Sequence, residues 1–157
     1  MYNIPTPLGD LFAVFDPHGA LTYLKFVPPA TVAGSQLDDC QADAARLLTI
    51  EMDAYFSGQL REFSVPIAPK GTVFQHRVWD HLLTIPYGQT ATYGQVARAL
   101  GSMGHSRAVG RANGTNPIFL IIPCHRVIGA DGRLTGYAGG LDKKAELLKL
   151  EKQFSCT

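Results

Sequence analysis

The stretch TVFQHRVWDHLLTIPYGQTATYGQVARALG, residues 72–101, predicts two helices separated by a turn. Thr72 can cap the first helix, whose apolar residues recur at helical spacing and which ends before Ile85-Pro86. Thr92 can cap the second, which ends at Gly101. This part of the chain is therefore predicted to be mostly helical.

A third helix is predicted just downstream, from near His105 to about Asn113-Gly114. Two short helices joined by a tight turn form a candidate helix-turn-helix. Helix pairs with glycine turns also occur in folds that never touch DNA, so the pattern alone does not establish DNA binding.

The first 70 residues contain shorter elements. Leu11–Phe15 and Leu21–Phe26 are rich in aromatic and β-branched residues and enclose the turn sequence DPHG, which predicts a hairpin. Phe63–Ile67 is a candidate third strand. Residues Gln36–Phe56 predict one long amphipathic helix with an apolar face made of Leu37, Cys40, Ala44, Leu47, Leu48, Met52 and Tyr55.

Composition indicates a folded protein. The 157 residues are 46% hydrophobic and 17% charged, which excludes a disordered tail and fits one domain or two small ones. No apolar run approaches the ~20 residues of a membrane span, and the first residues lack the pattern of a signal peptide. Three cysteines, Cys40, Cys124 and Cys156, argue against a disulfide scaffold and for a reducing compartment.

Charge is distributed unevenly along the chain. Residues 1–70 carry four lysines and arginines against eight acidic residues, a net charge of −4. Residues 71–157 carry ten against five, a net charge of +5. The basic half is consistent with a polyanionic partner, and an ordinary solvated surface is the alternative.

The segment NPIFLIIPCHRVIG, residues 116–129, carries the chemistry. We expect Ile118–Ile122 to be an extended apolar run that leads the chain inward. Cys124 follows, next to His125 and Arg126, and neighbouring cations lower the pKa of a thiol and favour the nucleophilic thiolate. A buried, inert cysteine is the alternative, against which the cationic neighbours argue.

Adjacent residues on a helix do not face each other. If Cys124–Arg126 is helical, a bridging water is the natural link between Cys124 and His125, and His125 then needs an acid to orient it. The downstream candidates are Asp131, Asp142, Glu146 and Glu151, and spacing does not choose among them.

PCHR and its following aliphatic, residues 123–127, resemble the active-site motif of the O6-alkylguanine-DNA alkyltransferases (methylated-DNA–protein-cysteine methyltransferases). The segments VFQHRVWDHLLTIPYGQTATYGQVARALG, SRAVGRANGTNP and GRLTGYAGGLDKKAELLKLE are similar to the family in order and spacing. The similarity covers about residues 71–152, more than half of the chain. TPLGDLFAVF, near the N-terminus, resembles the start of the family's variable domain.

The resemblance implies roles for the residues of the active site. Cys124 would accept the alkyl group, and His125 and Glu151 would form a water-linked relay that generates the thiolate. Asn116 would organise the active-site turn. Tyr93 would lie near the flipped guanine and donate a proton to its N3.

The resemblance also implies how the chain meets DNA. Arg107 would be the arginine finger that replaces the extruded base in the stack. Val127, Tyr137 and Ala138 would line the pocket for that base, with Lys144 nearby.

Three small residues surround Arg107 and would let its helix approach a narrow groove: Ser106, Ala108 and Gly110. Flipping a base out of the duplex costs a few kcal/mol of free energy, and a side chain inserted into the stack partly offsets this cost. Close packing between helices, which also favours small residues, is the alternative.

The chain departs from the family pattern at two places. The turn GSMGHS, residues 101–106, stands where many relatives have a proline and paired alanines, which puts groove fit and salt dependence in doubt. Ala138 stands where some relatives have serine. The family recognises O6 there through a backbone amide, so alanine suffices, although the tolerance of bulky alkyl groups can differ.

Neither a cofactor nor a metal is expected. The glycines of GYAGG, residues 136–140, lack the following Gly-Lys-Ser/Thr of a phosphate loop. No clear metal-ligand spacing with Cys40 or Cys156 is found at His18, His76, His81 or His105.

The sequence thus predicts an α+β fold. Residues 1–70 would form a small N-terminal α/β domain with a short antiparallel sheet. Residues 71–157 would form a mostly helical, winged-helix-like domain with a helix-turn-helix, which binds DNA and carries the alkyl acceptor.

The predicted function is DNA repair by direct reversal. The alkyl group of O6-alkylguanine, and of O4-alkylthymine, would pass once and irreversibly to Cys124 after base flipping. The expected partner is double-stranded DNA containing O6-alkylguanine, with no membrane. We expect a monomer located in the cytoplasm, at the nucleoid of a bacterium or archaeon, or in the nucleus of a eukaryote.

Three other functions compete with this prediction. An alkyltransferase-like protein that binds lesions without repairing them would lack the cysteine that this chain keeps. A Cys–His hydrolase needs an imidazole within direct reach of sulfur and an oxyanion hole, and would turn over repeatedly. A winged-helix transcription factor needs no reactive thiol.

Overall fold

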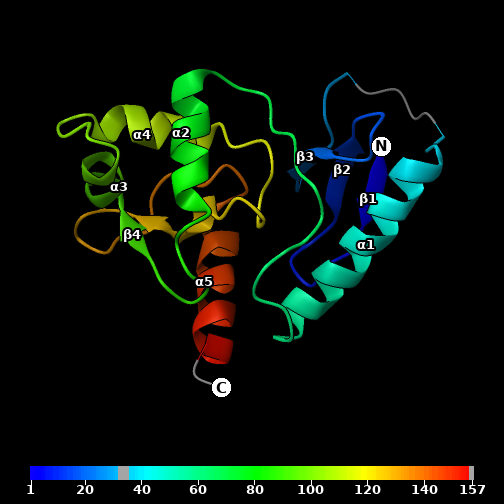
Figure 1. The fold of residues 1–157 in the computed structure, drawn as a ribbon. Coiled ribbons are helices and arrows are strands. Elements are labelled where there is room, and N and C mark those ends of the chain that lie inside the picture. Colours follow the sequence, from blue (N-terminus) through cyan, green and yellow to red (C-terminus); the bar gives the residue numbers. More distant parts are fainter. Residues whose placement is uncertain (32–35, 156–157) are drawn as a thin grey trace. The chain divides into compact units, whose positions relative to one another are not determined.

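The computed structural model describes residues 1–31 and 36–155, so that Cys156 lies outside the described residues. The described residues form five α-helices and a small antiparallel sheet, whose arrangement Figure 1 shows, and the predicted α+β class is confirmed. The chain divides into two compact units between Lys70 and Gly71. No helix in the described part of the chain is both long and apolar enough to cross a membrane.

The first unit contains a three-stranded antiparallel sheet in the order β1-β2-β3. Its strands are β1 (Tyr2–Ile4), β2 (Leu11–Phe15) and β3 (Leu21–Lys25). The predicted β2–β3 hairpin is confirmed, and alternate residues of β2 are buried as a one-sided sheet requires. Strand β1, only three residues long, was not predicted.

The predicted third strand over 63–67 is wrong. Only Ile67 pairs there, in an isolated parallel bridge with Leu21. Two neighbouring N–H groups instead donate to the carboxylate of Glu51, those of Ser64 at 2.8 Å and Val65 at 3.2 Å. Because a side-chain carboxylate, and not a neighbouring strand, accepts these two N–H groups, the segment does not form a strand.

Helix α1 (Asp39–Phe56) starts three residues later than predicted. Asp38 is its N-cap and forms a reciprocal capping box with Gln41, which fixes the start. Cys40 is exposed, so its predicted place on the apolar face is wrong. The face that is buried consists of Ala44, Ala45, Leu48, Glu51, Met52 and Tyr55.

The second unit is mostly helical, with α2 (Val73–Leu82), α3 (Tyr93–Ala99), α4 (Ser106–Gly114) and α5 (Leu141–Ser155). Thr72 and Thr92 cap α2 and α3 through capping boxes, as the sequence predicted. Helix α5 was not among the predicted elements. A two-residue parallel pairing joins β4 (Ala91–Thr92) to β5 (Val127–Ile128).

Helices α2, α3 and α4 pack together, and α5 lies below them in Figure 1. Trp79 on α2 is 1% exposed, and its indole N–H donates to the carbonyl of Ala112 on α4 at 2.9 Å. Helices α3 and α4 form the predicted helix-turn-helix. The turn between them includes Gly101 at φ 71°, a backbone conformation that favours glycine.

Candidate active site

The segment before Cys124 is a series of turns, so the extended run predicted over Ile118–Ile122 is wrong. Asn116 explains the turns. Its side-chain oxygen accepts from the N–H of Ile118 at 2.9 Å, and its amide nitrogen donates to the carbonyl of Ile122 at 2.8 Å. Leu120, inside the loop, is held at φ 72°, which is uncommon for a residue with a side chain. Fully buried, Asn116 thus fixes the route by which the chain reaches Cys124.

Cys124 begins a short 3-10 helix, η1 (Cys124–Arg126), and is 2% exposed. Its carbonyl accepts a hydrogen bond from the side-chain amide of Asn113 on α4, at 3.3 Å. The helix that carries the candidate DNA-binding residues is therefore tied directly to the backbone of the candidate nucleophile. Sequence reasoning missed Asn113, because nothing in the RANG segment distinguishes it from an ordinary helical asparagine.

The next two residues of η1 both bind Glu151 of α5. His125 Nε2 lies 2.7 Å from Glu151 Oε1. Arg126 makes a two-pronged contact, from Nε to Oε2 at 2.9 Å and from Nη2 to Oε1 at 2.8 Å, and its Nη1 donates to the carbonyl of Ile85 at 2.7 Å. The backbone N–H of Gly88 donates to Oε2 at 3.3 Å. Of the four acids that spacing left open, Glu151 is the one that His125 contacts.

Arg126 is the participant that sequence reasoning placed differently. Adjacency in PCHR suggested a cation acting on the Cys124 thiol, whereas its guanidinium lies on Glu151. Planar, two-pronged binding of a carboxylate is the geometry that arginine favours.

Burial and charge act against each other in this cluster. Burial alone would raise the pKa of Glu151, but the hydrogen bonds and charges of His125 and Arg126 outweigh it and hold the pKa well below the usual range. Burial lowers the pKa of His125 despite its contact with Glu151. A neutral His125 beside an ionised Glu151 results. With Nε2 on Glu151, the other ring nitrogen, Nδ1, is buried and has no hydrogen-bond partner in the described part of the chain.

A second set of residues surrounds a shared backbone carbonyl, that of Thr135. Lys144 is fully buried and donates from Nζ to the carbonyls of Thr135 at 2.8 Å and Val127 at 2.6 Å. The hydroxyl of Tyr93 donates to the same Thr135 carbonyl at 3.0 Å. Burial lowers the pKa of Lys144, and the nearby charge of the Cys124 thiolate opposes that shift.

Tyr137 is a further buried residue of the predicted pocket. It packs on Phe119 with ring centres 5.2 Å apart. Burial raises the pKa of Tyr137, and the charge of a Cys124 thiolate raises it further. Of the predicted pocket residues, Val127, Tyr137 and Lys144 are buried, whereas Ala138 is exposed.

The predicted DNA-binding residues all lie on α4. Arg107 is exposed, and Ser106, Ala108 and Gly110 are half-buried. A Cβ at Gly110 would lie 3.7 Å from Tyr93 Cδ1, which is ordinary van der Waals contact. Packing inside the unit therefore does not require glycine at this position, so close helix packing is not what favours it.

Comparison with known proteins gives the family. The model of the 6-O-methylguanine DNA methyltransferase DNA-binding domain matches residues 73–153, more than half of the chain. The chain belongs to the 6-O-methylguanine DNA methyltransferase family. The resemblance predicted from the sequence motifs is thereby confirmed.

Relatives of this family match over different lengths. A methylated-DNA–protein-cysteine methyltransferase of Mycobacterium leprae is 46% identical over 155 residues, which cover 96% of this chain and 90% of the relative. One from Mycobacterium tuberculosis is 59% identical over 102 residues, which span 65% of this chain and 62% of that relative's length. A crystal structure of Mycobacterium tuberculosis OGT in complex with DNA matches with a TM-score of 0.87 and 45% identity, covering 97% of this chain and 92% of the other.

Proposed function

We propose that the chain repairs alkylated DNA by direct reversal, with Cys124 as the acceptor of the alkyl group. The observation that carries the proposal is the buried Cys124 followed by a buried His125 whose Nε2 lies 2.7 Å from the carboxylate of Glu151. The full-length relatives of the chain are named for this transfer from methylated DNA to a protein cysteine. The proposed substrate of this chain is a DNA duplex that contains O6-alkylguanine or O4-alkylthymine.

The short helix η1 supports a water-linked activation of Cys124. Because neighbouring residues on a helix do not face each other, His125 reaches the thiol through one bridging water. The proton passes from Cys124 Sγ through this water to Nδ1 of His125. The imidazolium that forms is stabilised by the carboxylate of Glu151, 2.7 Å from Nε2.

The thiolate then attacks the alkyl carbon. A sulfur–carbon bond forms while the bond between that carbon and O6 of guanine breaks, and the electron pair stays on the guanine. Tyr93 donates a proton to N3 of the leaving base, and its hydroxyl is held in place by the Thr135 carbonyl until then. The product is a thioether that nothing in the site can reverse, so each molecule acts once.

The target base must leave the duplex before the reaction, because a stacked base is out of reach of a buried thiol. Arg107, exposed on the first turn of α4, fills the gap in the stack. The small residues beside it allow the helix to approach the minor groove. Every residue of the proposed site comes from the second unit of a single chain, so the transfer requires no second copy, and we expect a monomer.

Intact-mass analysis after mixing with an O6-methylguanine duplex tests the proposal. We expect one added methyl group per molecule, on the peptide that contains Cys124, and none in Cys124→Ser, which should still bind DNA. Cys40→Ser is the matched control because Cys40 is free and exposed, and it should accept the methyl group as the wild type does. A methyl group on Cys40, or repeated turnover by one molecule, would contradict the proposal.

Arg107→Ala separates base flipping from the chemistry. Transfer from duplex DNA should fall strongly, since flipping a paired base costs a few kcal/mol. Free O6-benzylguanine needs no flipping and should react at nearly the wild-type rate. Equal losses on duplex and free base would show that Arg107 does not act as the wedge.

A further inference from the structure

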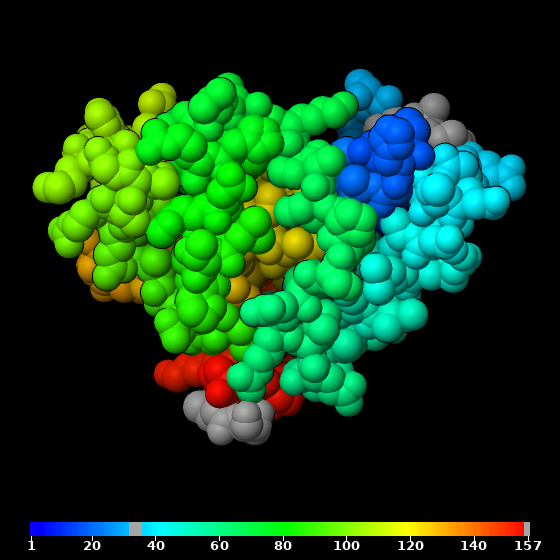
Figure 2. Space-filling model, viewed as in Figure 1, coloured from blue at the N-terminus to red at the C-terminus, as the bar shows by residue number. Residues whose placement is uncertain are grey.

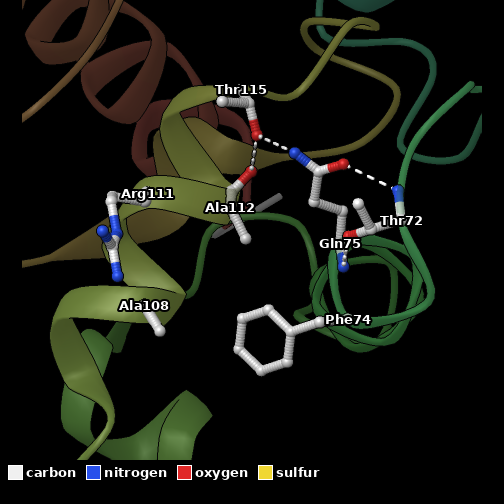
Figure 3. A pocket seen from close by; sticks show the side chains of 7 residues that line it. All are labelled: Thr72, Phe74, Gln75, Ala108, Arg111, Ala112 and Thr115. Carbon is white, nitrogen blue, oxygen red and sulfur yellow. Dashed lines mark hydrogen bonds between the residues drawn. The ribbon is translucent and has the colours of Figure 1, made fainter.

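A cavity of about 180 Å³ lies between the N-terminal end of α2 and one face of α4 (Figure 3). We refer to it as the α2–α4 groove. Phe74 and Ala108 lie on opposite sides of it, and Arg111 extends along the α4 side. The groove is lined by Thr72, Phe74, Gln75, Ala108, Arg111, Ala112 and Thr115.

Hydrogen bonds fix the width of the groove. The side-chain oxygen of Gln75 accepts from the N–H of Thr72 at 2.8 Å, within the capping box of α2. Its side-chain nitrogen donates to Thr115 Oγ1 at 3.0 Å, and the Thr115 hydroxyl donates to the carbonyl of Ala112 at 3.0 Å. One continuous chain of hydrogen bonds thus joins the two walls (Figure 3), and the groove exists before any ligand arrives.

The groove has an unneutralised positive charge at its edge. Arg111 is exposed, and within residues 1–31 and 36–155 no carboxylate lies within ion-pairing distance of it. Helix α4 contains Arg107 and Arg111 and no acidic residue.

The α2 side of the groove is open to solvent. The space-filling view shows that α2, in green, reaches the molecular surface, in agreement with the 81% exposure of Val73 at its first position (Figure 2).

Arg111 also has a defined relation to Arg107. Residues four apart on a helix share a face and are about 6 Å apart along its axis. The phosphates of a DNA strand advance about 3.4 Å per nucleotide along the duplex axis, so a phosphate bound by Arg111 lies within a few nucleotides of the position of Arg107.

We propose that the α2–α4 groove binds the sugar–phosphate backbone of DNA, with Arg111 on a phosphate and Phe74 and Ala108 against the adjoining deoxyribose. The proposal rests on the proposed function, because it takes DNA as the ligand of α4. It assigns Arg111 a role different from that of Arg107: Arg111 contacts every duplex alike, whether or not a base is flipped. An arginine that is merely solvated is the competing explanation.

The salt dependence of duplex affinity tests the role of Arg111. In Arg111→Gln, the slope of log K against log salt should become shallower by about one unit, because one phosphate contact is lost. The loss of affinity should be equal for lesion and undamaged duplexes, and the rate with free O6-benzylguanine should not change. Lys149→Gln removes one exposed charge from α5 and should keep the wild-type slope. An Arg111→Gln slope equal to that of Lys149→Gln would overturn the proposal.

Neutral methylphosphonates, placed one at a time in the lesion strand, locate the contact. At one phosphate or two adjacent ones, within a few nucleotides of the lesion, the substitution should weaken binding of the wild type but not of Arg111→Gln. If Arg111→Gln loses affinity at every phosphate as the wild type does, Arg111 does not bind a phosphate.

Phe74→Glu tests whether DNA occupies the groove itself. A carboxylate beside a bound phosphate should weaken binding of every duplex, with thermal unfolding measured to confirm that the variant is folded. Wild-type affinity in folded Phe74→Glu would overturn the groove assignment. These binding measurements do not depend on Cys124, so a failure of methyl transfer would reject the proposed function and leave the groove result standing.

Discussion

A glutamate is buried in each unit of the chain, Glu51 on α1 and Glu151 on α5, and the two have different kinds of partner. Glu51 accepts hydrogen bonds from the backbone N–H and the hydroxyl of Ser64 and from the N–H of Val65. All these donors are neutral, and they belong to the irregular segment that follows α1. Glu51 therefore holds a loop against its own unit.

Glu151 also accepts one backbone N–H, that of Gly88, but its other hydrogen bonds are to the side chains of an arginine and a histidine. Its two oxygens contact both Arg126 and His125, the residues that follow Cys124. The comparison shows how a buried carboxylate comes to serve chemistry: neutral donors fix a backbone, whereas an arginine keeps the carboxylate ionised for a neighbouring imidazole.

The largest effect is expected from removing the arginine. Arg126→Met leaves Glu151 buried without its cation, and breaking a buried ion pair in this way costs about 3–5 kcal/mol of the free energy of unfolding. Chemical denaturation at pH 7 measures it. Arg133→Gln is the control, since its ion pair with Asp131 is 82% and 60% exposed and should contribute under about 1 kcal/mol. Similar losses in the two variants would contradict the role given to Arg126.

A smaller effect is expected in the pH dependence of stability. The folded-state pKa of Glu151 lies below its ordinary value of 4.5, so its contribution is fully present above pH 4.5 and is lost as pH falls below it. As the pH is lowered below 4.5, we expect the free energy of unfolding of the wild type to fall by about 2 kcal/mol more than that of Glu151→Gln. Unfolding free energies measured from pH 6 downward test this, and parallel curves would show that Glu151 is not held ionised.

Glu151→Gln should also transfer methyl groups far more slowly than the wild type at neutral pH, while binding DNA nearly as well. Single-turnover rates against pH, with binding measured separately, distinguish this from a loss of folding. Wild-type rates across neutral pH would reject the relay.

Local signals explain what the sequence could predict. The capping threonines Thr72 and Thr92 and the hairpin turn each act over a few residues, and the elements that they mark are present. The PCHR segment likewise identified Cys124 and His125 together. In each case the information lies in one continuous stretch.

Long-range pairing explains what the sequence could not predict. Arg126 and Glu151 are 25 residues apart, and spacing left four acids open, among which only the family resemblance indicated Glu151. The β4–β5 pair joins residues 91–92 to 127–128, and only two residues on each side give no periodicity to detect. The strand that the local pattern favoured over residues 63–67 is also absent. The backbone N–H groups of residues 64 and 65 donate to the side chain of Glu51 and are therefore not available to a neighbouring strand.

Glu51→Gln should reduce stability without reducing repair. Its amide has one acceptor where the carboxylate has two, so a buried N–H loses its partner at a cost of about 1–3 kcal/mol. The rate of methyl transfer, measured well below the unfolding temperature, should match the wild type. Slower transfer by the folded variant would show that the two glutamates are not as separate as their partners indicate.

The smallest effect is expected for Ser64→Ala, which removes a single donor to Glu51 and leaves both backbone N–H groups in place. A hydrogen bond to a charged group contributes about 1.5–3 kcal/mol, but the Glu51 oxygen that loses the hydroxyl keeps the Ser64 N–H, so we expect a loss of about 1 kcal/mol. Ser57→Ala is the matched control in the same unit, because its hydroxyl donates to the Ala54 carbonyl in an exposed hydrogen bond rather than to a buried carboxylate. In the double variant with Glu51→Gln, the combined loss should be smaller than the sum, since both changes act on one hydrogen-bonded group. Strict additivity in denaturation experiments would mean that the Ser64 hydroxyl stabilises the loop through some other contact.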